Sequence, residues 1–482
     1  MRRILLTTLF LLFFAPLGVS AAPRSLSLGL SGSDVVSLQN ALIAKNYLPA
    51  GKNTGYFGLL TQTAVQKFQC AQSIACASTA GAGYGIYGPR TRATLMDNNS
   101  SVGSASISIA SPLEFSGWIP YWRTATGTQD VLPHLSQLTS VMPFGYTMKN
   151  DGTLADTARL TEEPWTSFIA EAKRNHVRVV PSVMWGNGDS IHRILSNAKT
   201  RIALEDEIAY VVKKNNFDGI DIDFEAKKHE TVDYFSTFLK GLRQRMGNKW
   251  IYCTIEARMP ITDRYLPGQI VPPDAMDYAN DYKALNKYCD RVEVMAYDQG
   301  IISRKLNKAR MAPYAPVADA AWVESLVTLA MKDIDKKKII IGVPTYGYEY
   351  LVTPVPGDGY KYKVLWPFNY KYATEIATKL GITPVRTSAN EVGFSYNPAL
   401  LEAAPPANGD ITQAQHIVST TETVAENAAL STNGQQPFNF LSWSDATAVA
   451  DKVALARKLG VRGVAVFKFD GGEDQKIWDV LR

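Results

Sequence analysis

The chain is poor in the residues that usually hold metal ions and in the motifs that hold nucleotides. Its 482 residues include four cysteines and five histidines. No Cys-x-x-Cys pair occurs and the histidines do not cluster with the cysteines, which argues against a structural zinc site. No Gly-x-Gly-x-x-Gly follows an early strand, which argues against a dinucleotide-binding fold. We therefore expect no metal ion and no cofactor.

Charge of one sign is also scarce. Lys and Arg number 50 and Asp and Glu number 45, for a formal charge of +5 without a basic tract. This distribution argues against nucleic acid as a partner. A hydrophobic fraction of 46% excludes a disordered chain. The length predicts two or three domains, or one barrel-sized domain with a small one.

Long apolar runs are absent after the first residues, so no membrane span is expected in a processed chain. Arg2 and Arg3 precede a largely apolar run from Ile4 to Phe14, and small residues end at Ala21. This pattern predicts a secretory signal peptide over residues 1–21, with an uncleaved membrane anchor as the alternative. We expect a secreted, periplasmic or cell-wall-associated monomer.

Export has consequences for the cysteines. Cys70 and Cys76 lie six residues apart in one loop-like segment, and in an oxidising compartment they are expected to form a disulfide. Cys253 and Cys289 lie in separate apolar segments, which is typical of buried thiols.

Residues 26–97 form a small module with an internal repeat. Residues 56–65 and 86–95 each contain an aromatic-Gly turn followed by a threonine, Thr61 or Thr91. Each threonine is expected to cap a helix by accepting a backbone N–H. Together with a helix that begins near Ser33, the pattern predicts three short helices.

The module resembles the peptidoglycan-binding domain found beside many cell-wall hydrolases. The matching segments are Gly32–Val35, Leu38-Gln39, Gly55–Gly58, Phe68-Gln69 and Tyr87–Thr91. A small helical spacer without a ligand is the alternative. Residues 98–112 are rich in serine and lack charge, which predicts a flexible linker.

Apolar strands alternate with helices over residues 113–482. The expected strands are Phe115–Pro120, Ser140–Gly145, Arg178–Val183, Gly219–Phe224, Trp250–Ile255, Arg291–Ala296, Lys338–Val343 and Gly463–Phe467. The alternation predicts an α/β fold, a (β/α)₈ TIM barrel, with a doubly wound sheet as the alternative. Residues 299–337 and 356–441 interrupt the pattern, and the second excursion is expected to be an inserted subdomain that walls one side of a cleft.

One predicted strand carries a row of acids. From Ile220 to Glu225 apolar and acidic residues alternate, so Asp221, Asp223 and Glu225 share one face, about 6.5–7 Å apart along the strand. Carboxyl groups crowded in a barrel interior raise one another's pKa, which suits a general acid. A solvated strand face and a metal site are the alternatives, but barrel strands are covered on both sides and the calcium-loop pattern is absent.

The acidic segment resembles the Asp-Gly-x-Asp-x-Asp-aromatic-Glu signature of glycoside hydrolase family 18, the chitinase-type barrels. The resemblance also includes Gly117–Trp122, Met295–Asp298, Gly342–Gly347 and Gly463–Asp474. Pro181–Gly186 lacks the family's usual Ser-x-Gly-Gly, and Phe467 stands where the family usually has tryptophan. The ending from Trp443 is similar to the branch that acts on bacterial cell walls and spore cortex.

The resemblance implies a retaining mechanism in which the 2-acetamido group of the substrate is the nucleophile. Glu225 would protonate the glycosidic oxygen, Asp223 would stabilise the oxazolinium ion, and Asp221 would share a proton with Asp223. Tyr297 would donate a hydrogen bond to the acetamido oxygen. The sugar-binding candidates are Asp298, Phe467, Tyr121, Trp122 and Trp185.

The expected substrate is a glycan with β-1,4-linked N-acetylglucosamine, and the N-terminal module favours peptidoglycan. Chitin or chitooligosaccharides are the first alternative. The second alternative is a non-catalytic cell-wall lectin, although Glu225, the acid whose loss inactivates this fold, is present.

Overall fold

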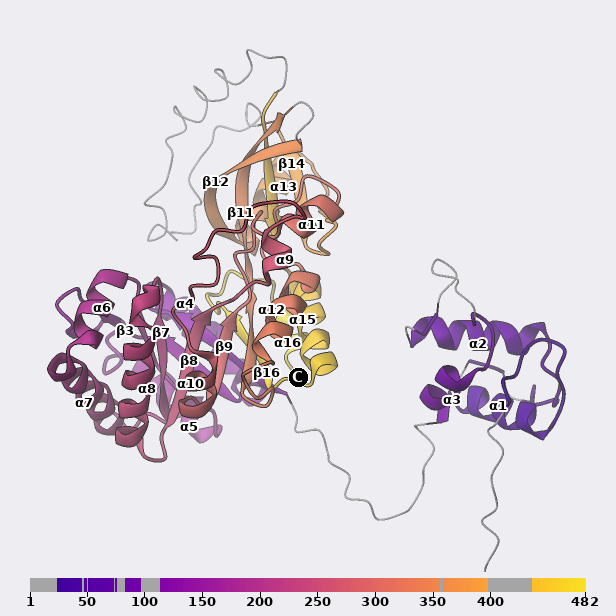
Figure 1. Ribbon diagram of the computed structural model, residues 1–482, viewed down its shortest axis with the longest axis horizontal. Coiled ribbons are helices and arrows are strands. Elements are labelled where there is room, and N and C mark those ends of the chain that lie inside the picture. The colour runs from indigo at the N-terminus through magenta and orange to yellow at the C-terminus, as the bar shows by residue number, and fades with distance from the viewer. Residues whose placement is uncertain are drawn as a thin grey trace, which may run out of the picture. The chain divides into compact units, whose positions relative to one another are not determined.

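The computed structural model describes residues 24–45, 47–49, 51–72, 74–75, 83–96, 113–355, 359–397 and 436–482. The chain divides into two compact units, Met1–Ala110 and Ser111–Arg482 (Figure 1). The signal peptide predicted over residues 1–21 and the linker predicted over residues 98–112 lie outside the described residues. In the part that is described, no helix has the length and apolar character needed to cross a membrane.

The N-terminal unit contains the three short helices that the sequence predicts. They are α1 (Ser33–Ala44), α2 (Leu59–Ala71) and α3 (Pro89–Met96). Leu38, Phe57, Val65 and Phe68 are at most 2% exposed and belong to its hydrophobic core.

The two repeat threonines do not cap helices as the sequence suggested, because each lies inside its helix as the third residue. Buried glutamines bind their hydroxyl groups. Nε2 of Gln39 donates to Oγ1 of Thr61, and Nε2 of Gln69 donates to Oγ1 of Thr91, both at 2.9 Å. Oε1 of each glutamine accepts the backbone N–H of a turn glycine at 2.8 Å. In each copy, one glutamine side chain therefore joins the turn to the helix that follows it, an arrangement that we call the glutamine clamp. The repeat in the sequence is a repeat of this clamp.

The second unit is a parallel barrel of eight strands, two of which are divided into two pieces. Helices lie around the outside of its strands (Figure 1). Its strands are β1 (Glu114–Pro120), β2 (Ser140–Phe144) with β3 (Tyr146–Met148), β5 (Arg178–Val179) with β6 (Ser182–Trp185), β7 (Gly219–Phe224), β8 (Trp250–Glu256), β9 (Arg291–Met295), β10 (Ile339–Pro344) and β16 (Gly463–Phe467). A short strand, β4 (Leu154–Asp156), pairs with β3 as an antiparallel edge.

The helices that follow the barrel strands vary in length. They are α4 (Thr124–Val131), α5 (Trp165–Arg174), α6 (Gly188–Ser196), α7 (Ala198–Lys214), α8 (Val232–Met246), α9 (Ile261–Arg264), α10 (Tyr282–Tyr288), α11 (Arg304–Ala309), α12 (Ala320–Ala330), α15 (Ala446–Leu459) and α16 (Ile477–Val480). The excursion predicted over residues 299–337 contains α11 and α12.

The barrel closes through its second and third strands. Ser140 and Val141 of β2 pair with β5, and Tyr146 and Thr147 of β3 pair with β6, all in parallel register. The sequence predicted one strand over Arg178–Val183. Pro181 interrupts it because proline has no N–H to give to the ladder, although its carbonyl still accepts the N–H of Asp221 at 2.9 Å.

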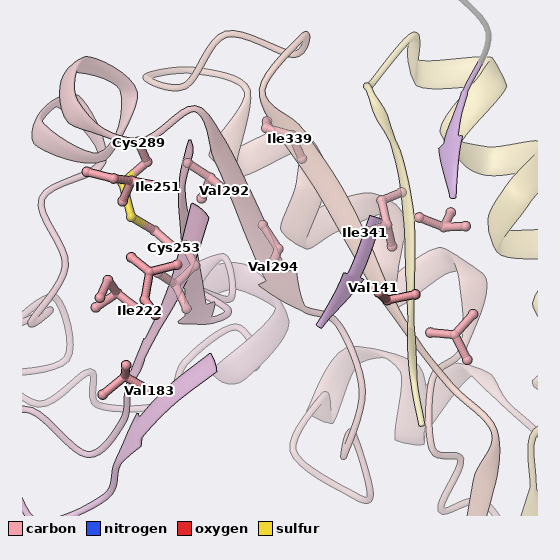
Figure 2. Close-up of a cluster of buried hydrophobic side chains, with 14 of the residues drawn as sticks. Val141, Val183, Ile222, Ile251, Cys253, Cys289, Val292, Val294, Ile339 and Ile341 are labelled. Carbon is pink, nitrogen blue, oxygen red and sulfur yellow. A yellow bond between two sulfur atoms is a disulfide. The ribbon is translucent and has the colours of Figure 1, made fainter. Parts of the chain in front are cut away.

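A large apolar core lies between the strands and the helices. Figure 2 shows Val183, Ile222, Val292, Val294 and Ile341 from neighbouring strands in this layer. All five are at most 1% exposed. These are the alternate positions of strands whose other positions face the barrel interior.

Cys253 and Cys289 are not free thiols as the sequence suggested, because a disulfide joins Cys253, in the middle of β8, to Cys289, which directly follows α10 (Figure 2). Their Cα atoms are 6.1 Å apart and both side chains are buried. The sequence could not predict this pairing, because the residues are 36 apart and only strand order makes them neighbours. Cys70 is also disulfide-bonded, while Cys76, its predicted partner, lies outside the described residues.

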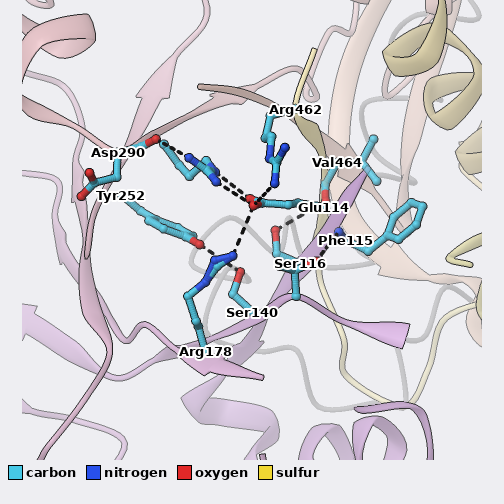
Figure 3. Close-up of polar contacts among 11 residues, drawn as sticks. Glu114, Phe115, Ser116, Ser140, Arg178, Tyr252, Asp290, Arg462 and Val464 are labelled. Atoms are coloured by element: carbon cyan, nitrogen blue, oxygen red, sulfur yellow. Dashed lines mark hydrogen bonds and ion pairs between the residues drawn. The ribbon is translucent and has the colours of Figure 1, made fainter. Parts of the chain in front are cut away.

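A carboxylate at the amino end of the barrel binds three arginines (Figure 3). Glu114, the first residue of β1, accepts hydrogen bonds from Arg178, Arg291 and Arg462 at 2.6–3.2 Å. Burial would raise the pKa of Glu114, but hydrogen bonds from Arg291 and Arg462 outweigh burial and lower it to about 2. Residues of β1, β5 and β9, and the residue directly before β16, are therefore joined at this one carboxylate.

A subdomain is inserted between β10 and β16, as predicted, but it begins at Tyr346 rather than at Pro356. Its sheet has the order β12-β11-β15-β14-β13, and α13 (Tyr370–Leu380) follows β12. The strands are β11 (Tyr346–Val355), β12 (Gly359–Asn369), β13 (Val385–Arg386), β14 (Val392–Tyr396) and β15 (Phe438–Trp443). All of its neighbouring strands are antiparallel.

Candidate active site

The acid row lies on the inner face of β7. Ile220, Ile222 and Phe224 belong to the outer apolar core, so strand alternation turns Asp221 and Asp223 into the barrel. Asp221 is 0% exposed and Asp223 is 3% exposed. Glu225 follows the last residue of β7, and its backbone N–H donates to the carbonyl of Trp185 at 2.8 Å.

Asp221 is the deepest of the three acids and is fixed by three donors from three other strands. It accepts hydrogen bonds from Trp118 Nε1 at 3.1 Å, Ser182 Oγ at 2.6 Å and Thr254 Oγ1 at 2.8 Å. Burial raises the pKa of Asp221 above its usual range, and these donors oppose the shift. Its side chain is therefore held in one orientation below Asp223.

Asp223 and Glu225 line a cavity of about 300 Å³ at the carboxyl ends of the strands, where active sites of such barrels lie. Burial raises the pKa of Asp223 well above its usual range, and the charges of Glu225 and Asp221 add to the shift. Burial and then the charge of Glu256 raise the pKa of Glu225, while Lys227 opposes them. These carboxyl groups therefore keep their protons to a higher pH than isolated carboxyl groups do.

Oδ1 of Asp223 has no hydrogen-bond partner among the described residues although it is buried. An unpaired buried acceptor costs free energy unless something binds it. Because Asp223 lines the cavity, this oxygen is available to a donor group on a bound molecule.

Tyr297 and Asp298 follow β9 and line the same cavity. The ring of Tyr297 stacks on Phe467 with 5.5 Å between centroids. Asp298 has a left-handed backbone, with φ of 60°, and accepts a hydrogen bond from Tyr348 at 2.7 Å. Burial raises the pKa of Asp298, and hydrogen bonds from Tyr346 and Tyr348 oppose the shift.

The aromatic sugar-binding candidates separate into two groups. Tyr121, Trp122 and Phe467 line the cavity. Trp185 does not: its side chain is 1% exposed, its Nε1 donates to Ser190 Oγ at 2.9 Å, and its ring packs edge-on against Phe224. Trp185 is therefore a core residue, and the sequence interpretation of it as a sugar platform was wrong.

The inserted subdomain contributes to the wall of the cleft. A smaller hollow shares Asp298 and Phe467 with the main cavity and is also lined by Tyr348 of β11 and by Pro367 and Phe368 of β12. The subdomain thus extends the cleft beyond the barrel strands.

Several residues around the acids were not among the predicted site residues. Trp118 and Thr254 bind Asp221 and line the cavity, and Met184 lines it too. Glu293 of β9 is 0% exposed, and its Oε2 lies 3.3 Å from Oγ1 of Thr254. Its signal was present in the sequence, because Val292-Glu293-Val294 repeats the alternation of the acid row.

Carboxyl groups of raised pKa in a polar and aromatic cleft at the carboxyl end of a barrel are the arrangement that a glycosidase needs. Comparison with known families agrees. The model described as "Glycosyl hydrolases family 18" matches residues 116–472, and that described as "Putative peptidoglycan binding domain" matches residues 31–95. The chain belongs to glycoside hydrolase family 18 and carries an N-terminal peptidoglycan-binding domain of this type.

Individual relatives are more distant. The chain is 29% identical over 164 residues to an uncharacterized glycosylase, YvbX, and 28% identical over 167 residues to a putative sporulation-specific glycosylase, YdhD, both of Bacillus subtilis. These matches cover 34% and 35% of this chain and 43% and 36% of the relatives. The chain thus spans less than half the length of these curated relatives.

Solved structures share the fold. The spore cortex-lytic enzyme SleL of Bacillus megaterium has a TM-score of 0.54 at 20% identity, covering 77% of this chain and 73% of SleL. A class V chitinase of Pseudomonas fluorescens has a TM-score of 0.58 at 20% identity, covering 77% of this chain and 98% of the chitinase.

Proposed function

We propose that this chain is an exported glycosidase that hydrolyses β-1,4 bonds of N-acetylglucosamine in peptidoglycan, with retention and with the substrate's acetamido group as nucleophile. The observation that carries the proposal is the convergence of Asp223, Glu225 and Tyr297 on one cavity. Family 18 is an exception to the two-carboxylate mechanism and uses substrate assistance.

In this proposal Glu225 is the general acid. Its raised pKa supports a carboxyl that still holds a proton near neutral pH. The proton passes to the glycosidic oxygen while the acetamido oxygen attacks the anomeric carbon and the leaving sugar departs. Glu225 then takes a proton from the water that opens the oxazolinium ion. This proton replaces the one that Glu225 gave to the glycosidic oxygen.

Asp223 and Tyr297 orient the acetamido group. The unpartnered Oδ1 of Asp223 accepts the amide N–H and stabilises the positive charge that develops there. Burial raises the pKa of Tyr297 well above its usual value, so its hydroxyl keeps the proton that it donates to the acetamido oxygen. Asp221 keeps Asp223 in place and shares a proton with it.

The N-terminal domain and the disulfides support peptidoglycan in an oxidising compartment as the setting. The domain matches a peptidoglycan-binding model. Disulfides such as Cys253–Cys289 persist in exported proteins and are rare in the cytosol. Chitin carries the same acetamido group and is an outcome of the test below.

The chemistry is tested by mass spectrometry of the products from purified peptidoglycan and from chitooligosaccharides. Wild type should release reducing N-acetylglucosamine ends from peptidoglycan, and Glu225→Gln should lower the rate by about 10²–10⁴-fold. Asp223→Asn should also be strongly impaired, whereas Tyr297→Phe, which loses one hydrogen bond, should be affected less. Hydrolysis of chitooligosaccharides alone would assign chitin, and binding without hydrolysis by wild type would assign a lectin.

The wall tether is tested separately by sedimentation with insoluble peptidoglycan. Deletion of residues 26–97 should lower the bound fraction and leave hydrolysis of short soluble glycans unchanged. Within the full chain, Leu60→Asp is the sharper variant, because Leu60 is 51% exposed and lines a groove of about 440 Å³ between α1 and α2. Equal sedimentation of wild type, the deletion variant and Leu60→Asp would show that the N-terminal domain does not tether the chain to peptidoglycan.

A further inference from the structure

The backbone on both sides of Glu225 is held by two charged side chains that do not line the cavity. On the preceding side, Nζ of Lys227 donates to the carbonyl of Phe224. On the following side, the backbone N–H of Ala226 donates to Oε1 of Glu256 at 2.6 Å. Each of the two peptide groups that flank Glu225 is therefore hydrogen-bonded to one of these two side chains.

The two side chains also contact each other. Nζ of Lys227 lies 3.6 Å from Oε2 of Glu256, the last residue of β8. Oε2 also accepts a hydrogen bond from Nδ2 of Asn280 at 3.3 Å. The side chain of Lys227 is fully buried and its ammonium lies over the ring of Phe235, 4.8 Å from the centroid.

The turn at Ala226 needs such support. Ala226 has a φ of 53°, a left-handed conformation that costs a residue with a Cβ on the order of 1 kcal/mol. The bond to Glu256 stabilises this conformation, which in turn sets the direction in which the side chain of Glu225 leaves the strand. A buried lysine also needs a partner, because an unpaired ammonium away from water is costly.

We propose that Lys227 and Glu256 form a positioning pair for the catalytic acid: together they fix the backbone around Glu225 and place one positive and one negative charge beside its carboxyl. The inference rests on the proposed role of Glu225 as general acid. Neither residue lines the cavity, so both act through Glu225.

Charges reach Glu225 from several elements packed around it. Asp223 lies on the same strand, Lys227 on the turn after it, Glu256 on β8, and Asp298 with Tyr297 after β9. Burial raises the pKa of Glu225, the negative charges of Glu256 and Asp298 raise it further, and Lys227 lowers it. Burial lowers the pKa of Lys227 itself, against the charges of Glu256, Asp223 and Glu225.

Glu225 must be protonated when the reaction begins, so the pKa of Glu225 sets the alkaline limb of the pH profile. Removing the negative charge of Glu256 and removing the positive charge of Lys227 should therefore move this limb in opposite directions. Glu256→Gln keeps an oxygen for the Ala226 N–H but removes a negative charge, so the alkaline limb of kcat/KM should move to lower pH. Lys227→Met keeps the length of the side chain without its charge, so the same limb should move to higher pH. The double variant should return toward the wild-type limb.

A third variant separates the effect of Glu256 on the backbone around Glu225 from the effect of its charge. Glu256→Ala also removes the acceptor for Ala226, so the rate at its own optimum should fall by up to about 10²-fold relative to Glu256→Gln. The matched control is Glu230→Gln, which removes the same charge from an exposed glutamate paired with Lys228 and His192. Its pH profile should equal that of wild type.

The outcomes distinguish this inference from the proposed function. If the Glu256 and Lys227 variants are folded by circular dichroism and lose rate without moving the limb in opposite directions, the pair is merely structural and the inference is wrong. If Lys227→Met does not fold, Glu256→Gln against Glu230→Gln still decides the direction. If wild type does not hydrolyse any glycan, the proposed function fails instead, before either variant is made.

Discussion

Trp118 and Asp221 are joined by a hydrogen bond of 3.1 Å from the indole Nε1 to a carboxylate oxygen, across the interior of the barrel. Trp118 lies on β1 and Asp221 on β7, 103 residues apart. Trp118 also lines the cavity, in edge-to-face contact with Phe467 at 5.9 Å between centroids. One side chain therefore connects the floor of the cleft to the acid beneath it.

Trp118→Phe should weaken this connection. The variant keeps an aromatic ring but leaves Asp221 with two of its three donors. A hydrogen bond to a charged group contributes about 1.5–3 kcal/mol, so the free energy of unfolding should fall by about that amount, and kcat on soluble glycan should fall with it. Denaturant titration and steady-state kinetics measure the two effects.

Trp165→Phe is the matched control for this substitution. Trp165 is 1% exposed, but its Nε1 has no hydrogen-bond partner among the described residues. The control therefore loses the same ring volume without losing a bond. Equal losses of stability and kcat in the two variants would show that volume, not the bond to Asp221, is responsible.

Strand alternation explains how much of the site the sequence could predict. The acids of β7 could be assigned to one face because each alternate residue is apolar. In β6 the same rule turns Ser182 and Met184 inward and Trp185 outward, but the sequence does not say which parity faces the interior. The assignment of Trp185 failed for that reason.

Side-chain contacts between elements that are distant in the chain could not be predicted from the sequence either. Glu256 and Lys227 meet because β7 and β8 are neighbours in the sheet, and the same order brings Cys253 beside Cys289. The eight strands themselves were predictable, because each is a short apolar run between helical patterns. Strand order follows from the barrel, whereas side-chain partners depend on register and rotamer.

The arginine cluster around Glu114 predicts an acid-sensitive step in stability. The pKa of Glu114 is about 2 in the folded chain and about 4.3 in an unfolded one. A lowered pKa stabilises the fold above the unfolded value, by roughly 3 kcal/mol here, and this contribution is lost as the pH falls from 5 toward 2. Urea unfolding between pH 7 and pH 2 measures the loss.

Glu114→Gln should remove most of this pH dependence and destabilise the fold at pH 7 by about 3 kcal/mol, since it leaves three arginines without their carboxylate. Glu162→Gln is the control, because Glu162 is 61% exposed and forms only a surface ion pair with Arg159. That variant should change stability by less than about 1 kcal/mol. Parallel curves for wild type and Glu114→Gln down to pH 2 would contradict the prediction.

The disulfide Cys253–Cys289 predicts a large loss of stability on removal. It closes a loop of 36 residues, for which the chain-entropy estimate is about 4 kcal/mol. The double variant Cys253→Ala/Cys289→Ala should lose about this free energy of unfolding. The predicted pair of Cys70 and Cys76 closes a much smaller loop and should contribute about 2 kcal/mol or less.

A peptide map without reductant checks both pairs in protein from an oxidising compartment. A tryptic digest should yield two peptides joined through Cys253 and Cys289, and one peptide in which Cys70 and Cys76 are joined to each other. Alkylation of Cys253 and Cys289 in unfolded, unreduced protein would show that their disulfide does not form, and alkylation of Cys70 and Cys76 would show the same for the other pair.

The repeated glutamine clamp predicts that Gln39 and Gln69 are structural rather than ligand-binding. Each is 1% exposed, and their amide groups bind equivalent turns and threonines. Gln39→Ala and Gln69→Ala should each destabilise the N-terminal domain by about 1–3 kcal/mol, with faster amide exchange at Gly55 and Gly85 respectively. Asn40→Ala, a change at the exposed neighbour of Gln39, should not alter exchange at Gly55.

Glu293 predicts the opposite pH dependence to Glu114. Thr254 Oγ1 has a single proton and donates it to Asp221 at 2.8 Å, so its 3.3 Å contact with Glu293 fits a protonated Glu293 that donates to Thr254. Burial, and then the charge of Asp221, raise the pKa of Glu293 well above its usual value. The folded chain must therefore hold a proton that the unfolded chain releases above about pH 4.3.

A raised carboxyl pKa makes the fold less stable as the pH rises above the unfolded value. Glu293→Gln is neutral and close in shape to the protonated acid, so it should be at least as stable as wild type at pH 7. Its advantage should grow between pH 5 and pH 8 in denaturant titrations, while Glu293→Ala should be less stable at every pH because it leaves a cavity. If Glu293→Gln loses stability as the pH rises in parallel with wild type, Glu293 is ionised in the folded barrel and the proton chain from Glu293 through Thr254 to Asp221 does not exist.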